Sequence, residues 1–121
     1  MKALVVDDSL TIRRIVIKAL DLAGITDVAE ACNGAEAVTA AQGGGFDLIL
    51  MDWNMPQMSG IEALAKLRAG GCKTPIIMVT TEAEKTRVIE AIKTGANDYL
   101  IKPFAPEQLA EKVKRLAPSA A

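Results

Sequence analysis

The sequence has 121 residues, of which 50% are hydrophobic, so it can bury one substantial core but is too short for two domains. Its 14 Lys and Arg residues nearly balance 15 Asp and Glu residues, and with a net charge of -1 we expect neither nucleic acid nor membrane as a partner. Histidine is absent, which excludes Ser-His-Asp and Cys-His nucleophiles, His-ligated zinc and a His general base.

Short apolar runs rich in branched residues alternate along the chain with segments of helical period. The runs are predicted strands at residues 3–6, 28–31, 48–51, 76–79 and 99–101. Apolar residues with helical spacing are Ile12, Ile15, Val16, Ala19, Leu20 and Ala23 in one segment and Leu109, Val113 and Leu116 in another. The pattern predicts one helix after each strand.

Capping signals place the helix boundaries independently of hydrophobicity. Three pairs have the spacing of a capping residue and its acid at the third helical position: Asn33 with Glu36, Ser59 with Glu62, and Thr81 with Glu84. Gly24 and Gly95 stand where helices are expected to end. Pro106 suits the first turn of the last helix.

Five uninterrupted strand-helix units predict an α/β fold, a doubly wound parallel sheet with helices on both faces. The first, third and fourth strands are the most apolar and are expected to be central, which favours the order 2-1-3-4-5. We expect a single domain over residues 1–121, with its core at about 2–116 and a short C-terminal tail. Ligands of such sheets bind beyond the carboxyl ends of the strands, here between strands one and three.

The remaining sequence features indicate where the chain works. The start, MKALVVDD, meets two acids after a short apolar run, and no stretch approaches the length of a membrane span, so we expect a cytoplasmic protein. Cys32 and Cys72 have neither metal-ligand nor redox spacing. They are expected to be free, buried thiols.

Three acids follow the strands that border the predicted crevice. Asp7 and Asp8 come directly after the first strand, and Asp52 comes after the third. Three converging carboxylates repel one another unless a cation intervenes, and an oxygen-only donor set suits Mg²⁺. Two simpler interpretations stay open: Asp8 as the N-cap of the next helix, and Asp52 as a turn acid in a loop closed by Pro56.

Two further strand ends bring complementary groups to the crevice. The fourth strand ends in Thr80, whose hydroxyl is expected to face the acids because Thr81 is the better helix cap. The fifth ends in Lys102, which Pro103 keeps extended; the alternative for Lys102 is a solvated strand end. A carboxylate, a hydroxyl, an ammonium and a metal site can stabilise a transferring phosphoryl group. Asp52, alone at its strand end, is the expected nucleophile.

In order and spacing, four motifs resemble the receiver domain of two-component response regulators. They are VVDDS, LILMDWNMP, IIMVTTE and YLIKPF, and the resemblance covers nearly the whole chain. Within the family, DWNMP, the MVT motif and KPF look most like the stand-alone chemotaxis regulators of the CheY type. These proteins have a flavodoxin-like fold with the order 2-1-3-4-5, so the strand order is also what the resemblance implies.

The resemblance implies a role for each site residue. Asp52 would accept a phosphoryl group from the phosphohistidine of a sensor histidine kinase. The ligands of Mg²⁺ would be Asp7, Asp8, Asp52 and the backbone carbonyl of Asn54. Thr80 and Lys102 would bond the phosphoryl oxygens, and Tyr99 would turn inward as Thr80 moves; the alternative for Tyr99 is an edge-strand aromatic half-buried against helix four. The Lys102-Pro103 peptide bond would be cis.

It also implies a signalling output instead of an enzymatic one, since the domain would catalyse only its own phosphorylation and dephosphorylation. Phosphorylation would change the surface of helix four, strand five and helix five, and this monomer would then bind a downstream protein such as the flagellar motor switch. A phosphatase could act on the product, and the β-branched Thr81 could alter its lifetime. Two alternatives remain: a phosphorelay outside chemotaxis, and an unphosphorylated interaction module.

Two unrelated functions fit the sequence less well. A phosphatase of the haloacid dehalogenase type needs a second Asp two residues after its nucleophile, and Asp7-Asp8-Ser9-Leu10 has none. A dinucleotide or flavin binder would carry G-x-G-x-x-G after the first strand, where this chain has two acids that would repel a phosphate.

Overall fold

A computed structural model describes residues 1–81 and 85–116 of the chain. In these residues strands and helices alternate in the order β1 (Lys2–Val6), α1 (Leu10–Leu22), β2 (Asp27–Ala31), α2 (Gly34–Gln42), β3 (Leu48–Asp52), α3 (Gly60–Ala69), β4 (Ile76–Thr80), α4 (Lys85–Thr94), β5 (Asp98–Ile101) and α5 (Pro106–Leu116). The expected C-terminal tail at 117–121 lies outside the described residues. The predicted cap of Thr81 with Glu84 also cannot be compared, because Glu84 lies outside them.

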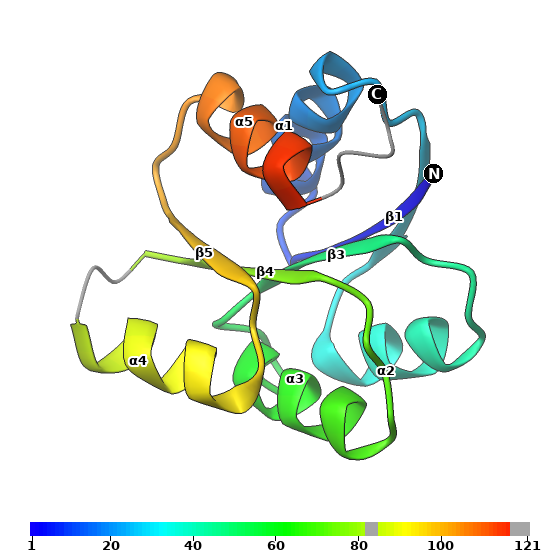
Figure 1. The fold of residues 1–121 in the computed structure, drawn as a ribbon, viewed down its shortest axis with the longest axis vertical. Coiled ribbons are helices and arrows are strands. Elements are labelled where there is room, and N and C mark those ends of the chain that lie inside the picture. The colour runs from blue at the N-terminus through cyan, green and yellow to red at the C-terminus, as the bar shows by residue number, and fades with distance from the viewer. Residues whose placement is uncertain (82–84, 117–121) are drawn as a thin grey trace.

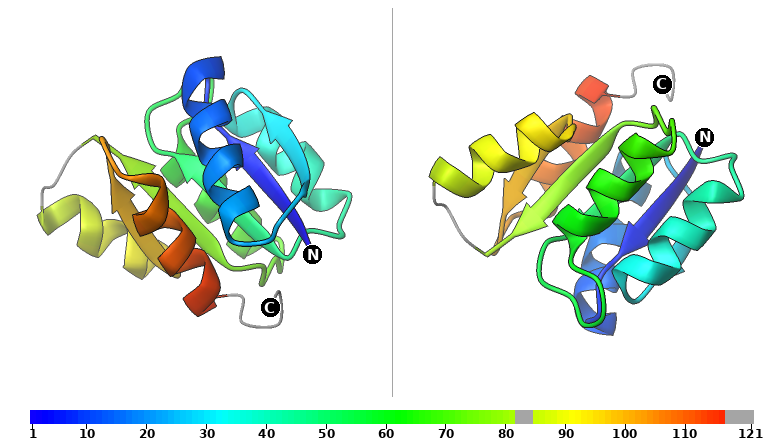
Figure 2. Two further views of the ribbon diagram at one scale, coloured as in Figure 1. Left: turned by 90° about the horizontal axis from the view of Figure 1, so that it is seen from above. Right: turned by 90° about the horizontal axis from the view of Figure 1, so that it is seen from below.

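The strands form one parallel sheet in the order β2-β1-β3-β4-β5, which confirms the predicted topology. Helices α1 and α5 cover one face, and α2, α3 and α4 cover the other (Figures 1 and 2). The predicted central strands are also the most buried, because β3 and β4 are buried along their whole length and β1 at all but its first residue. Each of these strands is covered by helices on both faces.

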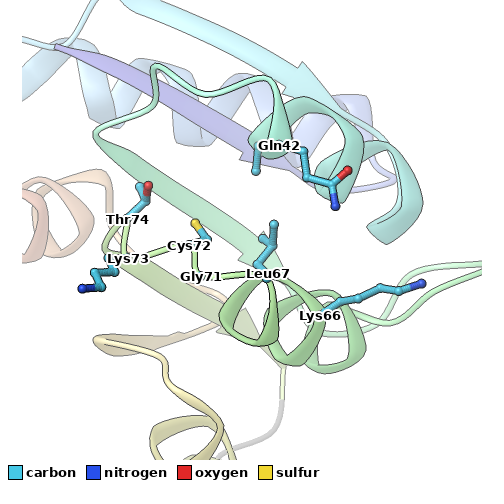
Figure 3. Close-up of a pocket in the computed structure, with 9 residues that line it drawn as sticks. Gln42, Lys66, Leu67, Gly71, Cys72, Lys73 and Thr74 are labelled. Carbon is cyan, nitrogen blue, oxygen red and sulfur yellow. The ribbon is translucent and has the colours of Figure 1, made fainter.

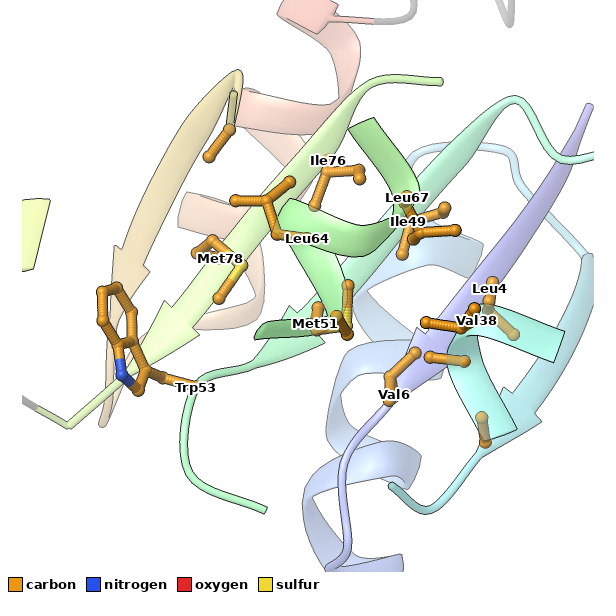
Figure 4. Close-up of a cluster of buried hydrophobic side chains, with 14 of the residues drawn as sticks. Leu4, Val6, Val38, Ile49, Met51, Trp53, Leu64, Leu67, Ile76 and Met78 are labelled. Atoms are coloured by element: carbon orange, nitrogen blue, oxygen red, sulfur yellow. The ribbon is translucent and has the colours of Figure 1, made fainter. Parts of the chain in front are cut away.

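Successive residues of the central strands point to opposite faces and form two cores. On one face, Ile49, Met51 and Met78 pack with Leu64 of α3, as Figure 4 shows. On the other face, the neighbouring strand residues pack against α1 and α5. Because each central strand contributes residues to both cores, all of its residues must be apolar. The sequence therefore shows continuous apolar runs at these strands instead of alternating apolar and polar residues.

The helix boundaries follow the predicted capping residues closely. Asn33 caps α2 by accepting a bond from the Glu36 amide, and Ser59 and Glu62 form a reciprocal capping box at α3. Gly24 and Gly95 follow α1 and α4 with φ of 87° and 123°, a conformation that favours glycine. Within the described residues, no helix has both the length and the apolar character required to cross a bilayer.

Two strands run one residue beyond their predicted ends, and this extension positions the site. Asp52 still pairs with Val79, and Thr80 still pairs with Ile101. The apolar pattern stops before these polar residues, but the backbone ladder does not. The carboxylate and the hydroxyl therefore sit on rigid strand backbone, where their positions are better fixed than on a loop.

Candidate functional site

The parallel register places the predicted site residues at one edge of the sheet. Val6 of β1 pairs with Met51 of β3, so the residues that follow, Asp7 and Asp52, lie at the same level. Asp7 continues the ladder toward β2, since its amide donates to the carbonyl of Ala31 at 3.1 Å. The crevice predicted between strands one and three is therefore where two of the acids emerge.

The three predicted acids form a cluster that fits a divalent cation. One carboxylate oxygen from each of Asp7, Asp8 and Asp52 lies within 4.8 Å of the others. Asp7 and Asp52 are only 3% and 5% exposed, while Asp8 lies open to solvent. Oxygen ligands, two buried acids and an open side match the way Mg²⁺ binds through a few carboxylates and keeps several waters.

Lys102 lies between the two buried acids and partly compensates their charge. Its Nζ is 3.0 Å from Oδ2 of Asp7 and 3.2 Å from Oδ1 of Asp52. Its side chain is 15% exposed, so the alternative of a solvated strand end is wrong. The backbone holds it there, because the Lys102 amide donates to the carbonyl of Thr80 at 2.7 Å. The Lys102-Pro103 peptide bond is cis, as expected.

The charges of this site shift two pKa values. Burial and the charge of Asp7 raise the pKa of Asp52 above its ordinary range, and the ammonium of Lys102 offsets this only in part. Burial works against the charged form of Lys102, but its hydrogen bonds and ion pairs with Asp7 and Asp52 outweigh burial and raise its pKa. Both directions are compatible because one ammonium serves two carboxylates and lies nearer to Asp7.

The helix-cap interpretation of Asp8 is wrong. Ser9 caps α1, and its hydroxyl accepts a bond from the Ile12 amide at 3.3 Å. Asp7 Oδ1 in turn accepts from the Ser9 amide at 2.9 Å. A Ser one residue after an acid is an equally good cap, and nothing in the local sequence decides between them. Asp8 is left on the open side of the acid cluster.

Two residues that the sequence analysis did not single out, Arg13 and Gly60, support the backbone of the acids. Arg13 of α1 donates to the backbone carbonyl of Asp7 at 2.7 Å and pairs with Glu30 of β2 at 2.9 Å. Gly60 donates its amide to the carbonyl of Trp53 at 2.8 Å and closes the loop after Asp52. A side chain at Gly60 would collide with the backbone of Asp52. Its place just after the Ser59 cap is the signal that could have revealed it.

The residues directly after Asp52 connect the site to α4. Trp53 is 6% exposed and belongs to the core on the side of α3 and α4, where Figure 4 shows it at the edge of the cluster. Asn54, whose carbonyl was expected to face the metal, is exposed. Arg87 of α4 contacts both residues, with its guanidinium carbon 4.8 Å from the Trp53 ring centroid.

The predicted switch residues lie on neighbouring strands. Thr80 is 2% exposed at the end of β4, and Tyr99 is half-buried in β5, paired with Met78. Lys112 of α5 lies over the Tyr99 ring at 5.4 Å and forms an ion pair with Asp98 at 3.0 Å. The ring of Tyr99 is therefore covered in part by Lys112 of α5, an element that the edge-strand interpretation did not name.

Two surface pockets differ in their relation to the acids. A groove of about 320 Å³ adjoins the cluster and is lined by Ile12, Ile15, Lys102 and Phe104, among others. The pocket in Figure 3 lies between the ends of α2 and α3 and includes Cys72, in the segment that leads into β4. It therefore lies at the amino end of the strands, away from the site.

The cysteine prediction is partly wrong. Both thiols are free, but Cys32 is exposed and Cys72 only half-buried. Cys32 lies where β2 meets α2, and its Sγ is 3.2 Å from a carboxylate oxygen of Glu36. That hydrogen bond raises the pKa of the Cys32 thiol. This exposure could not be predicted, because a cysteine after a strand is compatible with either a buried or an exposed environment.

Comparison with known sequences identifies one family and several close relatives. The family described as the response regulator receiver domain matches residues 3–114. "Chemotaxis protein CheY" of Pseudomonas aeruginosa is 42% identical over 118 residues, covering 96% of this chain and 95% of that protein. "Chemotaxis protein CheY1" of Helicobacter pylori strain J99 is 46% identical over 117 residues, covering 94% of each chain.

Solved structures agree with the sequence comparisons. The receiver domain of the Francisella response regulator 1452 superimposes with a TM-score of 0.90 at 33% identity, covering 99% of this chain and 98% of that one. Chemotaxis protein CheY4 of Vibrio cholerae superimposes with a TM-score of 0.87 at 42% identity, covering 95% of this chain and 97% of that one.

Proposed function

Because the chain belongs to the response regulator receiver family, we propose that it is a phosphorylation-dependent switch of a two-component system in which Asp52 is the phosphoacceptor. The observation that carries the proposal is the acid cluster itself: Asp7, Asp8 and Asp52 within 4.8 Å, with Lys102 bridging the two buried members. Three acids that converge at one crevice repel one another, so a cation or a phosphoryl group with its cation would relieve that repulsion.

The proposed reaction uses the carboxylate of Asp52 as nucleophile. Its oxygen attacks the phosphorus of a phosphohistidine on a sensor histidine kinase, a P–O bond forms, and the P–N bond breaks with its electron pair returning to the imidazole. Bound Mg²⁺, held by Asp7, Asp8, Asp52 and the Asn54 carbonyl, would neutralise phosphoryl charge. Lys102 would move from the carboxylate of Asp52 to a phosphoryl oxygen, supported by the Thr80 hydroxyl.

Phosphorylation would then change the surface formed by α4, β5 and α5. The acyl phosphate carries more negative charge than the carboxylate, together with three acceptor oxygens that attract Thr80 and Lys102. A shift of Thr80 on β4 would open space for the ring of Tyr99 on the neighbouring strand. Such a change biases two arrangements of one surface, so a partner that prefers one of them binds in a phosphorylation-dependent way.

The relatives that are named as chemotaxis proteins support a role in chemotaxis. We propose a cytoplasmic monomer that receives its phosphoryl group from a chemotaxis kinase, binds a downstream protein such as the flagellar motor switch, and is returned to its resting state by its own hydrolysis or by a phosphatase. A stand-alone role in another phosphorelay is the alternative. Phosphorylation-dependent binding to an isolated motor switch protein would distinguish them.

Amide hydrogen exchange tests the switch. With Mg²⁺ and acetyl phosphate as donor, exchange in α4, β5 and α5 is expected to change in the wild type, because the phosphoryl group alters the contacts of Thr80 and Tyr99. The Asp52→Asn variant receives the same reagents and is expected to show no change. A wild type that is phosphorylated without any change in these elements would refute the proposed output surface.

A further inference from the structure

Arg87 of α4 contacts two residues of the turn that follows Asp52. Its guanidinium carbon lies 4.8 Å from the centroid of the Trp53 ring, and its Nη1 lies 3.5 Å from Oδ1 of Asn54. Trp53 is 6% exposed, so the guanidinium covers a ring that is already embedded in the core. An Arg stacked on a partly desolvated Trp is a stabilising cation–π contact.

The contacted residues have little freedom on their backbone side. The Trp53 amide donates to the carbonyl of Val79 at 2.8 Å, and the Trp53 carbonyl accepts from the Gly60 amide at 2.8 Å. Asn54 follows in the turn and is exposed, so its side chain depends on contacts such as the one from Arg87. A movement of α4 that carries Arg87 away would release Asn54 and uncover Trp53.

We propose that Arg87 is a positioning residue that couples α4 to the acid cluster through Trp53 and Asn54. The inference rests on the proposed function, in which the Asn54 carbonyl helps hold Mg²⁺. By restraining the turn, Arg87 lowers the conformational cost of binding the cation. Because coupling is reciprocal, a cation at the acids also stabilises the position of α4. The side chain on α4 thus provides a second connection, separate from Thr80 and Tyr99.

If Arg87 acted only through its charge, its removal would strengthen Mg²⁺ binding, whereas loss of a positioning residue would weaken it. A positive charge near a cation site repels the cation, so removing it would tighten Mg²⁺ binding. Positioning requires the planar guanidinium, which Lys cannot supply although it keeps the charge. Arg87→Lys and Arg87→Gln therefore separate the two roles. Lys93→Gln is the matched control, because Lys93 is an exposed cation on the same helix.

The experiment has a metal-free part and a Mg²⁺ titration, both read by the fluorescence of Trp53, the only Trp in the sequence. Without metal, acrylamide is expected to quench Trp53 more strongly in both Arg87 variants than in the wild type and Lys93→Gln. In the titration, both Arg87 variants are expected to bind Mg²⁺ about two- to fivefold more weakly, a change within the range of one cation–π contact.

Unchanged quenching in Arg87→Gln overturns the inference whatever Mg²⁺ does. Tighter Mg²⁺ binding in Arg87→Gln with wild-type behaviour in Arg87→Lys overturns it in favour of a charge effect. A wild type that shows no response to Mg²⁺ refutes both the metal site of the proposed function and the coupling, while increased quenching in the Arg87 variants would show that the contact itself exists. Failure of the proposed metal site and failure of the Arg87 contact therefore give different results.

Discussion

At the scale of single residues, the environment of Asp52 disfavours the charged form of its carboxyl group. Burial and the neighbouring Asp7 raise its pKa, and Lys102 is shared with Asp7. A site that binds a cation and a phosphoryl group is expected to disfavour its own charged carboxylates while it is empty. The repulsion between these carboxylates is relieved when the cation binds. The proposed site therefore lowers the stability of the metal-free protein, and ligand binding would restore it.

The substitution Asp52→Asn is expected to stabilise the metal-free protein at pH 7 by about 1 kcal/mol, the usual scale of a single substitution. The sign follows from linkage: a carboxyl whose pKa is raised by folding stabilises the protein in acid and loses that contribution as pH rises through the folded-state pKa. Asn cannot ionise and keeps an oxygen for Lys102.

Urea unfolding in EDTA, compared between pH 7 and acid below the ordinary carboxyl pKa of about 4, measures the effect. The advantage of Asp52→Asn is expected to shrink in acid, and to shrink at pH 7 when Mg²⁺ is added, because the cation favours the wild-type carboxylate. A variant less stable than the wild type at pH 7 in EDTA would show that Lys102 fully compensates both acids.

At the scale of elements, the turn between β3 and α3 is fixed by how closely the helix start approaches the strand end. A Cβ at Gly60 would lie 2.8 Å from the Asp52 carbonyl carbon and still nearer to its oxygen. Both atoms are backbone, so the strand or the helix would have to move. The α3 cap at Ser59 and the position of Asp52 at the end of β3 therefore depend on a residue without a side chain.

Gly60→Ala is expected to destabilise the protein by about 2 to 3 kcal/mol, as overpacking of a tight site does, and to weaken Mg²⁺ binding by displacing Asp52. Gly70→Ala is the control at the other end of α3, where a Cβ would meet backbone oxygens only at 3.5 and 3.6 Å. Thermal unfolding and a Mg²⁺ titration of both variants check this, and equal behaviour of the two would contradict the close approach.

At the scale of the whole molecule, much of the fold follows from local signals in the sequence. The continuous apolar runs at 48–51 and 76–79 predict strands buried on both faces, and the caps at Asn33 and Ser59 fix where helices begin. The crevice follows from the topology, since it lies where strand order reverses. These features are readable because each depends on residues close together in the chain.

The parts that could not be predicted depend on contacts between distant segments. Arg13 reaching the Asp7 carbonyl and Arg87 stacking on Trp53 join elements that the sequence separates, and neither Arg differs locally from a solvated one. Ser9, and not Asp8, caps α1, although both residue types are good caps and the local sequence does not decide between them. Long-range packing sets these details.

Whether Asp52 accepts a phosphoryl group is decided by the intact mass of the wild type and of Asp52→Asn after incubation with acetyl phosphate, with and without Mg²⁺. We expect one phosphoryl adduct on the wild type that requires Mg²⁺, and none on Asp52→Asn, whose side chain has nearly the same shape and keeps an oxygen for Lys102. No adduct on a folded wild type that binds Mg²⁺, or an adduct of equal yield on Asp52→Asn, would contradict Asp52 as the phosphoacceptor.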